Sequence, residues 1–280
     1  MTIDPDKIGL IAGSGQFPLL FIEAARAAGR SVVVAAHLGE TSDEVARAAD
    51  QVQWLKLGQL GKIIKFFRQE GVGETVFLGG ITKTRMFFDI LPDIKGLTLW
   101  NKIDTRQDDA ILRAVAGALE KEGIRVLEST LYLQHLLFPQ GVLTRKKPSP
   151  QQRLDIEFGW KNAREIGRLD IGQCVVVRDL SVMAVEAIEG TDAAIARGGQ
   201  LAREKVVVVK VRKPTQDFRF DLPAIGLRTV QGLAAVKGAV LAVEAGQSLL
   251  FDREETIAVA NQAGIVVVGI KELADGTLEY

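Results

Sequence analysis

The order of apolar and polar positions differs between the two halves of the chain. Between residues 7 and 140, short β-branched runs bounded by glycine alternate with longer segments of helical period. Strands that alternate with helices and are apolar on both faces are typical of a parallel sheet covered by helices. The pattern predicts strands at 8–12, 31–36, 53–57, 74–78 and 124–127, and helices at 16–28, 60–70 and 108–122.

A break in this pattern follows at residues 141–150, which contain glycine, two prolines and three consecutive basic residues, as a linker does. Ser149 and Pro150 suit the first turn of a helix that runs to about residue 169. The rest predicts strands at 173–178, 182–188, 205–211, 239–243 and 265–270, a hairpin turn at 179–181, helices at 191–202, 229–236 and 253–263, and a polar loop at 213–225. We therefore expect an α/β protein with a Rossmann-like parallel-sheet domain at 1–143 and a second, mixed α/β domain at 144–280.

The amino-acid composition excludes several kinds of binding partner and metal site. Basic and acidic side chains number 35 each, so the net charge of zero provides no general field for binding nucleic acid. The lone cysteine, Cys174, excludes an intrachain disulfide and a thiolate zinc site, and its apolar run is typical of a core. The two histidines, His37 and His135, are too few for a histidine-rich metal site and are expected to be structural. A bound metal would therefore have oxygen ligands, as Mg²⁺, Mn²⁺ and Ca²⁺ prefer.

The sequence shows no targeting or membrane-spanning segment. The amino-terminal run MTIDPDKIGL is acidic, unlike a secretory signal. The longest apolar runs have the size of strands and are well short of the roughly 20 residues that span a bilayer. We expect a cytoplasmic protein.

Two glycine-rich loops follow predicted strands. Gly13, Ser14 and Gly15 stand where a strand passes into a helix, a place where backbone N–H groups can meet a phosphate. The full dinucleotide motif would need a third glycine where Pro18 stands, and an acid about 20 residues later. This loop therefore predicts either a phosphate or sugar contact or a plain tight turn.

Gly79, Gly80 and Lys83 follow a later strand, and ligands of open parallel sheets bind at the carboxyl ends of the strands. This second loop either faces an anion or is a flexible turn with solvated basic residues. Both interpretations remain open.

Polar residues also follow strands of the second half. Thr191 and Asp192 either bind substrate or a cation, or cap a helix with Thr191 as the N-cap. Glu244 ends another predicted strand and is either a site carboxylate or a structural acid.

The most unusual segment is the loop between Pro214 and Pro223. Lys213 and Arg219 could grip a phosphate while Asp217 and Asp221 face a metal or a water molecule. The alternative is a set of surface ion pairs, each of which contributes little. The length of the loop and its two prolines favour function.

Taken together, these segments resemble one family, the LpxI-type UDP-2,3-diacylglucosamine pyrophosphatases of lipid A biosynthesis. The resemblance runs over essentially the whole chain, and the motifs of the second half are the specific ones. It is carried, in order, by IGLIAGSGQFP, LGQLGK, GVLTRKKPS, DIGQCVVV, AVEAIEGTD, KPTQDFRFDLPAIG and AVEAG.

The resemblance implies a Mg²⁺-dependent hydrolase, with Mn²⁺ as an alternative, that cleaves UDP-2,3-diacylglucosamine to UMP and 2,3-diacylglucosamine 1-phosphate. Water would attack the phosphorus on the sugar side. Asp221 matches the key catalytic aspartate of the family and would either ligate the metal or orient the water. Asp217 and Glu244 are further metal candidates. Substrate contacts are expected from Gly13, Ser14, Gly15, Gly79, Gly80, Lys83, Thr191, Asp192, Lys213 and Arg219.

The resemblance also implies two domains with a lipid substrate between them. Such a protein would touch the cytoplasmic face of the inner membrane transiently and peripherally, and a second copy of the chain, as a homodimer, is a further candidate partner. Two alternatives remain: a non-catalytic protein that binds a nucleotide sugar or glycolipid, and an NAD-dependent nucleotide-sugar oxidoreductase.

Overall fold

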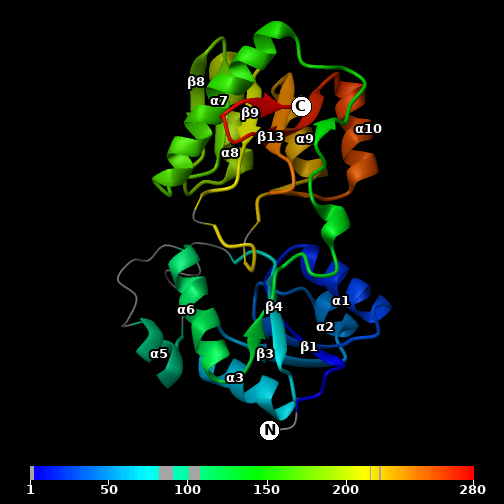
Figure 1. Cartoon of the computed structure of the whole chain (residues 1–280), viewed down its shortest axis with the longest axis vertical. Helices are drawn as coiled ribbons and strands as arrows, with labels where there is room; N and C mark the ends of the chain where they lie inside the picture. The colour runs from blue at the N-terminus through cyan, green and yellow to red at the C-terminus, as the bar shows by residue number, and fades with distance from the viewer. Residues whose placement is uncertain (1–2, 82–90, 101–107, 215, 221) are drawn as a thin grey trace. The chain divides into compact units, whose positions relative to one another are not determined.

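The computed structural model describes residues 3–81, 91–100, 108–214, 216–220 and 222–280. Contacts divide the chain into two compact units (Figure 1). The first contains residues 1–134 and 217–221, and the second contains residues 135–216 and 222–280. The chain therefore passes between the units three times. The α/β class with a parallel sheet and a mixed sheet is confirmed.

The first unit is built on a parallel sheet of five strands in the order β3-β2-β1-β4-β5. Almost every residue of the central strands β1 and β2 is buried, as expected for a sheet covered on both faces. They are β1 (Lys7–Ala12), β2 (Ser31–His37), β3 (Gln51–Leu55), β4 (Glu74–Leu78) and β5 (Arg125–Val126).

The helices of the first unit are α1 (Phe17–Ala27), α2 (Asp43–Ala48), α3 (Leu60–Gln69), α5 (Ile94–Trp100) and α6 (Asp108–Lys121). One core cluster joins apolar residues of α3 and α6 to Ile11, Val33 and Phe77 of the sheet. In Figure 1, α1 and α2 lie on the opposite side of the strands from α3 and α6. This is the doubly wound arrangement that the alternating pattern predicts.

The second unit has a mixed sheet in the order β14-β13-β11-β9-β7-β8, with β6 paired to β13. Neighbours among β9, β11 and β13 are parallel, whereas β7, β8, β6 and β14 each run antiparallel to the strand they pair with. The strands are β6 (Gly141–Val142), β7 (Cys174–Arg178), β8 (Ser181–Val185), β9 (Val207–Lys210), β11 (Val240–Glu244), β13 (Val266–Glu272) and β14 (Leu278–Glu279). A separate parallel pair joins β10 (Ala224–Ile225) to β12 (Leu249–Leu250).

Two apolar layers cover the second sheet. Cys174 and Val176 pack with residues of α8 (Thr191–Ala202), α9 (Leu227–Ala235) and α10 (Arg253–Ala263). Val175 and Val177 point the other way, toward α7 (Pro150–Arg168), because successive side chains of a strand face opposite sides. The predicted burial of Cys174 is confirmed.

The local signals around α7 and the β7–β8 hairpin act as predicted. The Ser149 hydroxyl accepts from the Gln152 N–H, and the Gln152 side chain accepts from the Ser149 N–H, which completes a capping box. The two residues Asp179 and Leu180 connect the hairpin with φ of 49° and 58°, the left-handed conformation that two-residue turns require.

The structure differs from the predictions at several element boundaries. The third strand is Gln51–Leu55 rather than 53–57, and it is largely exposed because β3 is an edge strand. The pattern did not reveal α2, α5 or the short pieces β6, β10, β12, β14 and the 3₁₀ turn η1 (Gln134–Leu136). Residues 135–143, which the predicted boundary leaves in the first domain, pair with the second unit through β6 and β13.

Candidate functional site

The two predicted glycine loops meet at one edge of the first sheet. Gly13–Gly15 follows β1, and Gly79–Gly80 follows β4, which is the neighbour of β1 in the sheet. The Ser14 N–H donates to the Gly80 carbonyl at 2.8 Å, and the Gly80 N–H donates to the Ser14 carbonyl at 3.1 Å. The strand order reverses between β1 and β4, and ligands of doubly wound sheets bind at such a reversal. We call these two loops the glycine turns.

The glycine turns are so close that they exclude side chains. A Cβ atom on Gly13 would lie 2.4 Å from the Gly80 carbonyl oxygen, and one on Gly79 would lie 2.5 Å from the Ser14 carbonyl oxygen. Gly15 and Gly79 also have φ of 91°, a conformation that glycine adopts without strain. Helix α1 begins directly after the first turn and has no acidic residue in its first turn. This edge therefore presents backbone groups and the positive end of a helix.

His37, at the end of β2, supports the first glycine turn. Its Nδ1 lies 3.0 Å from the Ala12 carbonyl oxygen, which the Thr41 hydroxyl also approaches to 2.7 Å. Because a carbonyl can only accept, Nδ1 carries the proton. Burial lowers the pKa of His37 below its usual value. These contacts agree with a structural role.

The segment Asp217–Phe220 docks against the same sheet. The Phe218 carbonyl accepts hydrogen bonds from the Ser129 N–H at 3.2 Å and the Ser129 hydroxyl at 3.0 Å, just beyond β5. The buried Phe220 ring meets Phe77 edge-on, with 5.5 Å between the ring centres. Phe77 stands in β4 two residues before Gly79. Two aromatic residues that the sequence analysis did not consider thus anchor this segment near the second glycine turn.

The charged residues of this segment pair with each other. The Arg219 guanidinium contacts the Asp217 carboxylate at 2.8 Å and Glu120 at 3.0 Å. The hydrogen bond from Arg219 lowers the pKa of Asp217. The predicted phosphate contact and the predicted metal ligand are therefore partners of one another. Asp221 and Lys83 lie outside the described residues.

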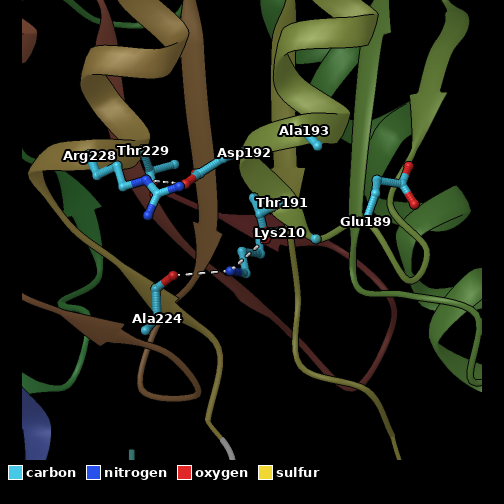
Figure 2. A pocket seen from close by; sticks show the side chains of 9 residues that line it. Glu189, Thr191, Asp192, Ala193, Lys210, Ala224, Arg228 and Thr229 are labelled. Carbon is cyan, nitrogen blue, oxygen red and sulfur yellow. Dashed lines mark hydrogen bonds and ion pairs between the residues drawn. The ribbon is translucent and has the colours of Figure 1, made fainter. Parts of the chain in front are cut away.

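The second unit contains a cavity of about 370 Å³ at the start of α8 (Figure 2). The first turn of α8 lines it, together with Glu189, Lys210, Ala224, Arg228 and Thr229. The predicted substrate residues Thr191 and Asp192 both lie in this wall. Asp192 forms an ion pair with Arg228 at 2.8 Å.

Lys210 is a buried cation in the wall of this cavity, and the sequence pattern did not indicate its role. Only 5% of the residue is exposed, and its Nζ donates to the Thr191 hydroxyl and to the Ala224 carbonyl, each at 3.0 Å. The Thr191 hydroxyl donates in turn to the buried Glu186 carboxylate at 2.7 Å. The prediction that Thr191 is the N-cap of α8 is therefore wrong. Gly190 occupies the N-cap position, and the Thr191 side chain binds Lys210 and Glu186 instead. The available signal was a lysine that ends an unbroken valine run.

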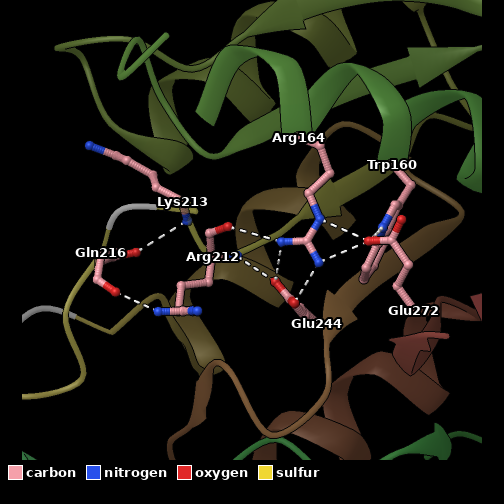
Figure 3. A network of polar contacts seen from close by, with 7 residues as sticks. All are labelled: Trp160, Arg164, Arg212, Lys213, Gln216, Glu244 and Glu272. Atoms are coloured by element: carbon pink, nitrogen blue, oxygen red, sulfur yellow. Dashed lines mark hydrogen bonds and ion pairs between the residues drawn. The ribbon is translucent and has the colours of Figure 1, made fainter. Parts of the chain in front are cut away.

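Glu244, at the end of β11, is bound by an arginine (Figure 3). Arg164 of α7 donates to both carboxylate oxygens, at 2.7 and 3.1 Å, and the Arg212 backbone N–H donates at 2.8 Å. Nearby, the Lys213 Nζ lies 2.7 Å from Asp170. The predicted phosphate contact Lys213 thus also has a carboxylate partner.

Of the three predicted metal ligands, Asp217 and Glu244 lie within the described residues and Asp221 does not, so the metal site stays a prediction. Asp217 and Glu244 are each held by a guanidinium group, a partner that competes with a cation for the same oxygens. Among the described residues, no group of three or more histidine, cysteine, aspartate or glutamate side chains could hold a metal ion. We therefore derive no chemical step through a metal.

The fold and these edges define a two-unit α/β protein. Its first sheet ends in close glycine turns, and its second sheet ends in buried charged side chains. No helix of the described ranges combines the length and the apolar character needed to cross a bilayer.

The chain belongs to the LpxI family. Family models of the LpxI N-terminal domain and the LpxI C-terminal domain match residues 7–136 and 139–268. A relative from Caulobacter vibrioides named UDP-2,3-diacylglucosamine pyrophosphatase LpxI is 36% identical over 277 residues, which cover 94% of this chain and 97% of the relative. The family resemblance drawn from the sequence motifs is confirmed.

Likenesses to solved structures are weak. The biotin carboxylase subunit of pyruvate carboxylase is 13% identical, with a TM-score of 0.28, and the match covers 66% of this chain and 38% of that one. The biotin carboxylase domain of the Hydrogenobacter thermophilus 2-oxoglutarate carboxylase is 13% identical, with a TM-score of 0.25 and coverage of 70% and 41%. Neither supports an argument about function.

Proposed function

We propose that this protein hydrolyses the pyrophosphate bond of UDP-2,3-diacylglucosamine to UMP and 2,3-diacylglucosamine 1-phosphate. The observation that carries the proposal is the 36% identity, over 94% of the chain, to a relative named for this activity. The docking of Asp217–Phe220 beside the glycine turns supports it, because this segment directly precedes Asp221.

The reaction needs one water molecule and transfers no electrons. The water oxygen forms a bond to the sugar-side phosphorus, and the bond from that phosphorus to the bridging oxygen breaks. UMP leaves with the bridging oxygen, and the proton of the water is released. The positive end of helix α1, which begins directly after the first glycine turn, is proposed to face the diphosphate, where a dipole that is already oriented stabilises developing charge.

We assign the central catalytic role to Asp221, as a group that orients the attacking water or ligates Mg²⁺. Magnesium, with manganese as the alternative, remains a proposal from the family; when bound it would neutralise charge on the phosphoryl oxygens. We assign substrate contacts to Thr191 and Asp192 at the cavity of the second unit, with Lys210 as the buried cation that holds Thr191.

The substrate carries two acyl chains, so it resides in a membrane. We therefore propose that the protein meets the cytoplasmic face of the inner membrane peripherally. Co-sedimentation with vesicles that contain the substrate, compared with vesicles that lack it, measures this contact.

The decisive test is UMP release by the wild-type chain and by Asp221→Ala. We expect the substitution to lower turnover by about a thousandfold or more while substrate binding persists. Asp275→Ala, in an exposed turn, serves as the matched control and should keep wild-type turnover. Unchanged turnover in Asp221→Ala would contradict the catalytic role. Binding without any turnover in the wild type would instead favour the non-catalytic alternative.

Two further measurements separate parts of the proposal. In ¹⁸O-labelled water, the label should enter the sugar 1-phosphate; label in UMP would contradict attack at the sugar-side phosphorus. Excess EDTA should abolish turnover, and added Mg²⁺ should restore it. Full turnover in the chelator would remove the metal from the proposal.

A further inference from the structure

Helix α5 presents a row of apolar side chains to the solvent. It lies at the periphery of the first unit, beside α3 and α6 (Figure 1). Ile94 is 85% exposed, Leu97 is 51% exposed, and Leu91, which precedes the helix, is 54% exposed. Exposed apolar residues that occur singly are ordinary, whereas a group of them rimmed by polar residues marks a surface for a protein or a membrane. We call these three residues the α5 patch.

The other side of α5 is packed against the first unit. A Cβ atom on Gly96 would lie 2.1 Å from the Gly58 carbonyl oxygen, so the two backbones are in direct contact. The Asp93 carboxylate accepts from the Gly96 N–H at 2.9 Å and from the Lys62 N–H of α3 at 3.0 Å. Leu99 packs against the core cluster of α3 and α6. The exposure of the patch is therefore not a sign that α5 lacks contacts with the unit.

Three exposed lysines lie next to the patch, and among the described residues none of them forms an ion pair: Lys56, Lys62 and Lys65. The Leu91 N–H donates at 3.0 Å to the carbonyl of the residue that follows Lys56. Lys62 is in contact with Asp93 through its backbone, and Lys65 lies one turn further along the exposed side of α3. Apolar and cationic side chains are thus combined on one surface of the first unit.

The carboxylates that contact α5 do not balance these three lysines. Glu122 binds two cations, Arg68 and Lys95. Asp93 uses both of its oxygens for the backbone N–H groups at the start of α5 and α3. The surface around the patch therefore has an excess of positive charge, which attracts an anionic partner.

We propose that the α5 patch and its three lysines are the surface with which this protein docks on an anionic phospholipid bilayer. The inference rests on the proposed function only in that a lipid substrate brings the protein to a membrane. Apolar side chains of a docking helix enter the boundary between headgroups and acyl chains, while lysines remain at the phosphates. Each lysine near an anionic surface strengthens binding by about fivefold.

A second copy of the chain fits this surface less well than a bilayer. A symmetric dimer places the same patch of both protomers in one interface. The three unpaired lysines of one protomer would then approach those of its partner, and like charges in an interface weaken binding. An anionic bilayer instead supplies the opposite charge together with an apolar interior.

The first experiment measures binding of the full-length chain to vesicles that contain no substrate. The wild type should sediment with vesicles of phosphatidylglycerol and phosphatidylethanolamine. Vesicles of phosphatidylcholine alone should bind at least about fivefold more weakly, because they carry no net charge. A rise in NaCl from about 0.1 to about 0.5 M should also weaken binding to the anionic vesicles, since salt screens exposed charges.

The second experiment removes the apolar part of the surface. I94S/L97S should weaken partitioning into the anionic vesicles by about tenfold or more, because two apolar side chains no longer leave water. The matched control L169S/L201S removes two leucines of similar exposure, 58% and 65%, from the second unit. This control should bind as the wild type does.

The third experiment removes charge and leaves α5 itself intact, so it remains informative if I94S/L97S fails to fold. K62Q/K65Q should weaken partitioning by about 20-fold at low salt. The matched control K147Q/K161Q removes two exposed lysines of the second unit and should bind as the wild type does. Equal losses in this pair of variants would indicate a response to net charge alone and overturn the inference.

The remaining outcomes separate docking from catalysis. A wild type that does not bind anionic vesicles, or unchanged binding by folded I94S/L97S, would overturn the docking surface. Self-association of the wild type that I94S/L97S abolishes would assign the patch to a second copy and also overturn it. A wild type that binds vesicles but releases no UMP would contradict the proposed function alone. Release of UMP from substrate in detergent micelles, without vesicle binding, would contradict docking alone.

Discussion

At the carboxyl ends of β1 and β4, the first sheet ends in glycine backbone, whereas at the ends of β9 and β11 the second sheet ends in the buried charges Lys210 and Glu244. Both edges are crowded, but for different reasons. The first edge is tight because two turns exchange backbone hydrogen bonds, and the second because each charge is surrounded by its donors or acceptors. The first edge should therefore lose stability when volume is added, and the second when charge is removed.

The largest effect is expected from Gly79→Ala. The new Cβ would lie 2.5 Å from a backbone oxygen and 2.8 Å from a backbone carbon, at a φ of 91°. We expect the first unit to lose about 3 kcal/mol of unfolding free energy, measured by hydrogen exchange of β1 and β4 amides. Gly117→Ala, in α6 with open space around it, is the matched control and should stabilise by about 0.5–1 kcal/mol. Equal stability of both variants would contradict the view that the first edge excludes added volume.

Lys210→Met tests the second edge by removing a charge at nearly constant volume. The Ala224 carbonyl loses its donor, and Thr191 loses one partner. We expect the second unit to lose about 2 kcal/mol, seen as faster exchange of β9 and β10 amides. The control Lys271→Met, at an exposed position of β13, should change stability by less than about 0.5 kcal/mol. A neutral Lys210→Met would mean that the buried charge is dispensable.

Phe220→Leu tests the packing of the segment that docks on the first sheet. The substitution keeps the side chain apolar but removes the edge-on contact with Phe77. We expect a loss of about 1 kcal/mol. In a double-mutant cycle with Phe77→Leu, the coupling energy should be about 0.5–1.5 kcal/mol. Strict additivity would show that the two rings do not stabilise one another.

The smallest effect concerns pH. Because burial lowers the pKa of His37, the folded chain protonates this side chain less readily than the unfolded chain, which binds a proton below a pH of about 6.5. Stability contributed by His37 is therefore present above that pH and declines as the pH falls. Between pH 7.5 and 6, the first unit should lose at most about 0.8 kcal/mol relative to His37→Asn, the limit in which only the unfolded chain binds the proton; the Asn amide keeps a donor for Ala12. Parallel pH curves from urea unfolding of the two proteins would contradict this.

Most of the fold could be predicted from local patterns. The strand at 74–78 and the helix at 253–263 lie where the apolar periodicity placed them. The predicted position of the edge strand β3 was wrong by two residues, because the exposed side chains of Val52 and Trp54 do not follow the pattern of a buried strand. Helix α2 is short, and Ser42, whose side chain accepts from the Val45 N–H, was its main signal.

The candidate site could be predicted only in part. The glycine turns could be predicted because backbones that approach closely or adopt a positive φ require glycine, which is visible in the sequence. The roles of Lys210 and Arg164 were missed, because a lysine or arginine has the same appearance in sequence whether it is solvated or buried. In the loop at 213–225, the charged residues were predicted to be functional, whereas Phe218 and Phe220, which anchor the loop, carried no signal in the sequence pattern.

Most of the longer strands, the parallel character of the first sheet and the family could be inferred from the amino-acid sequence, because periodicity, turn residues and motifs extend over a few neighbouring positions. The choice of charge partners became visible only in the folded chain: Arg219 with Asp217, Lys213 with Asp170, and Arg164 with Glu244. The physical reason is that ion pairing depends on distance and burial, which the packing of remote segments sets.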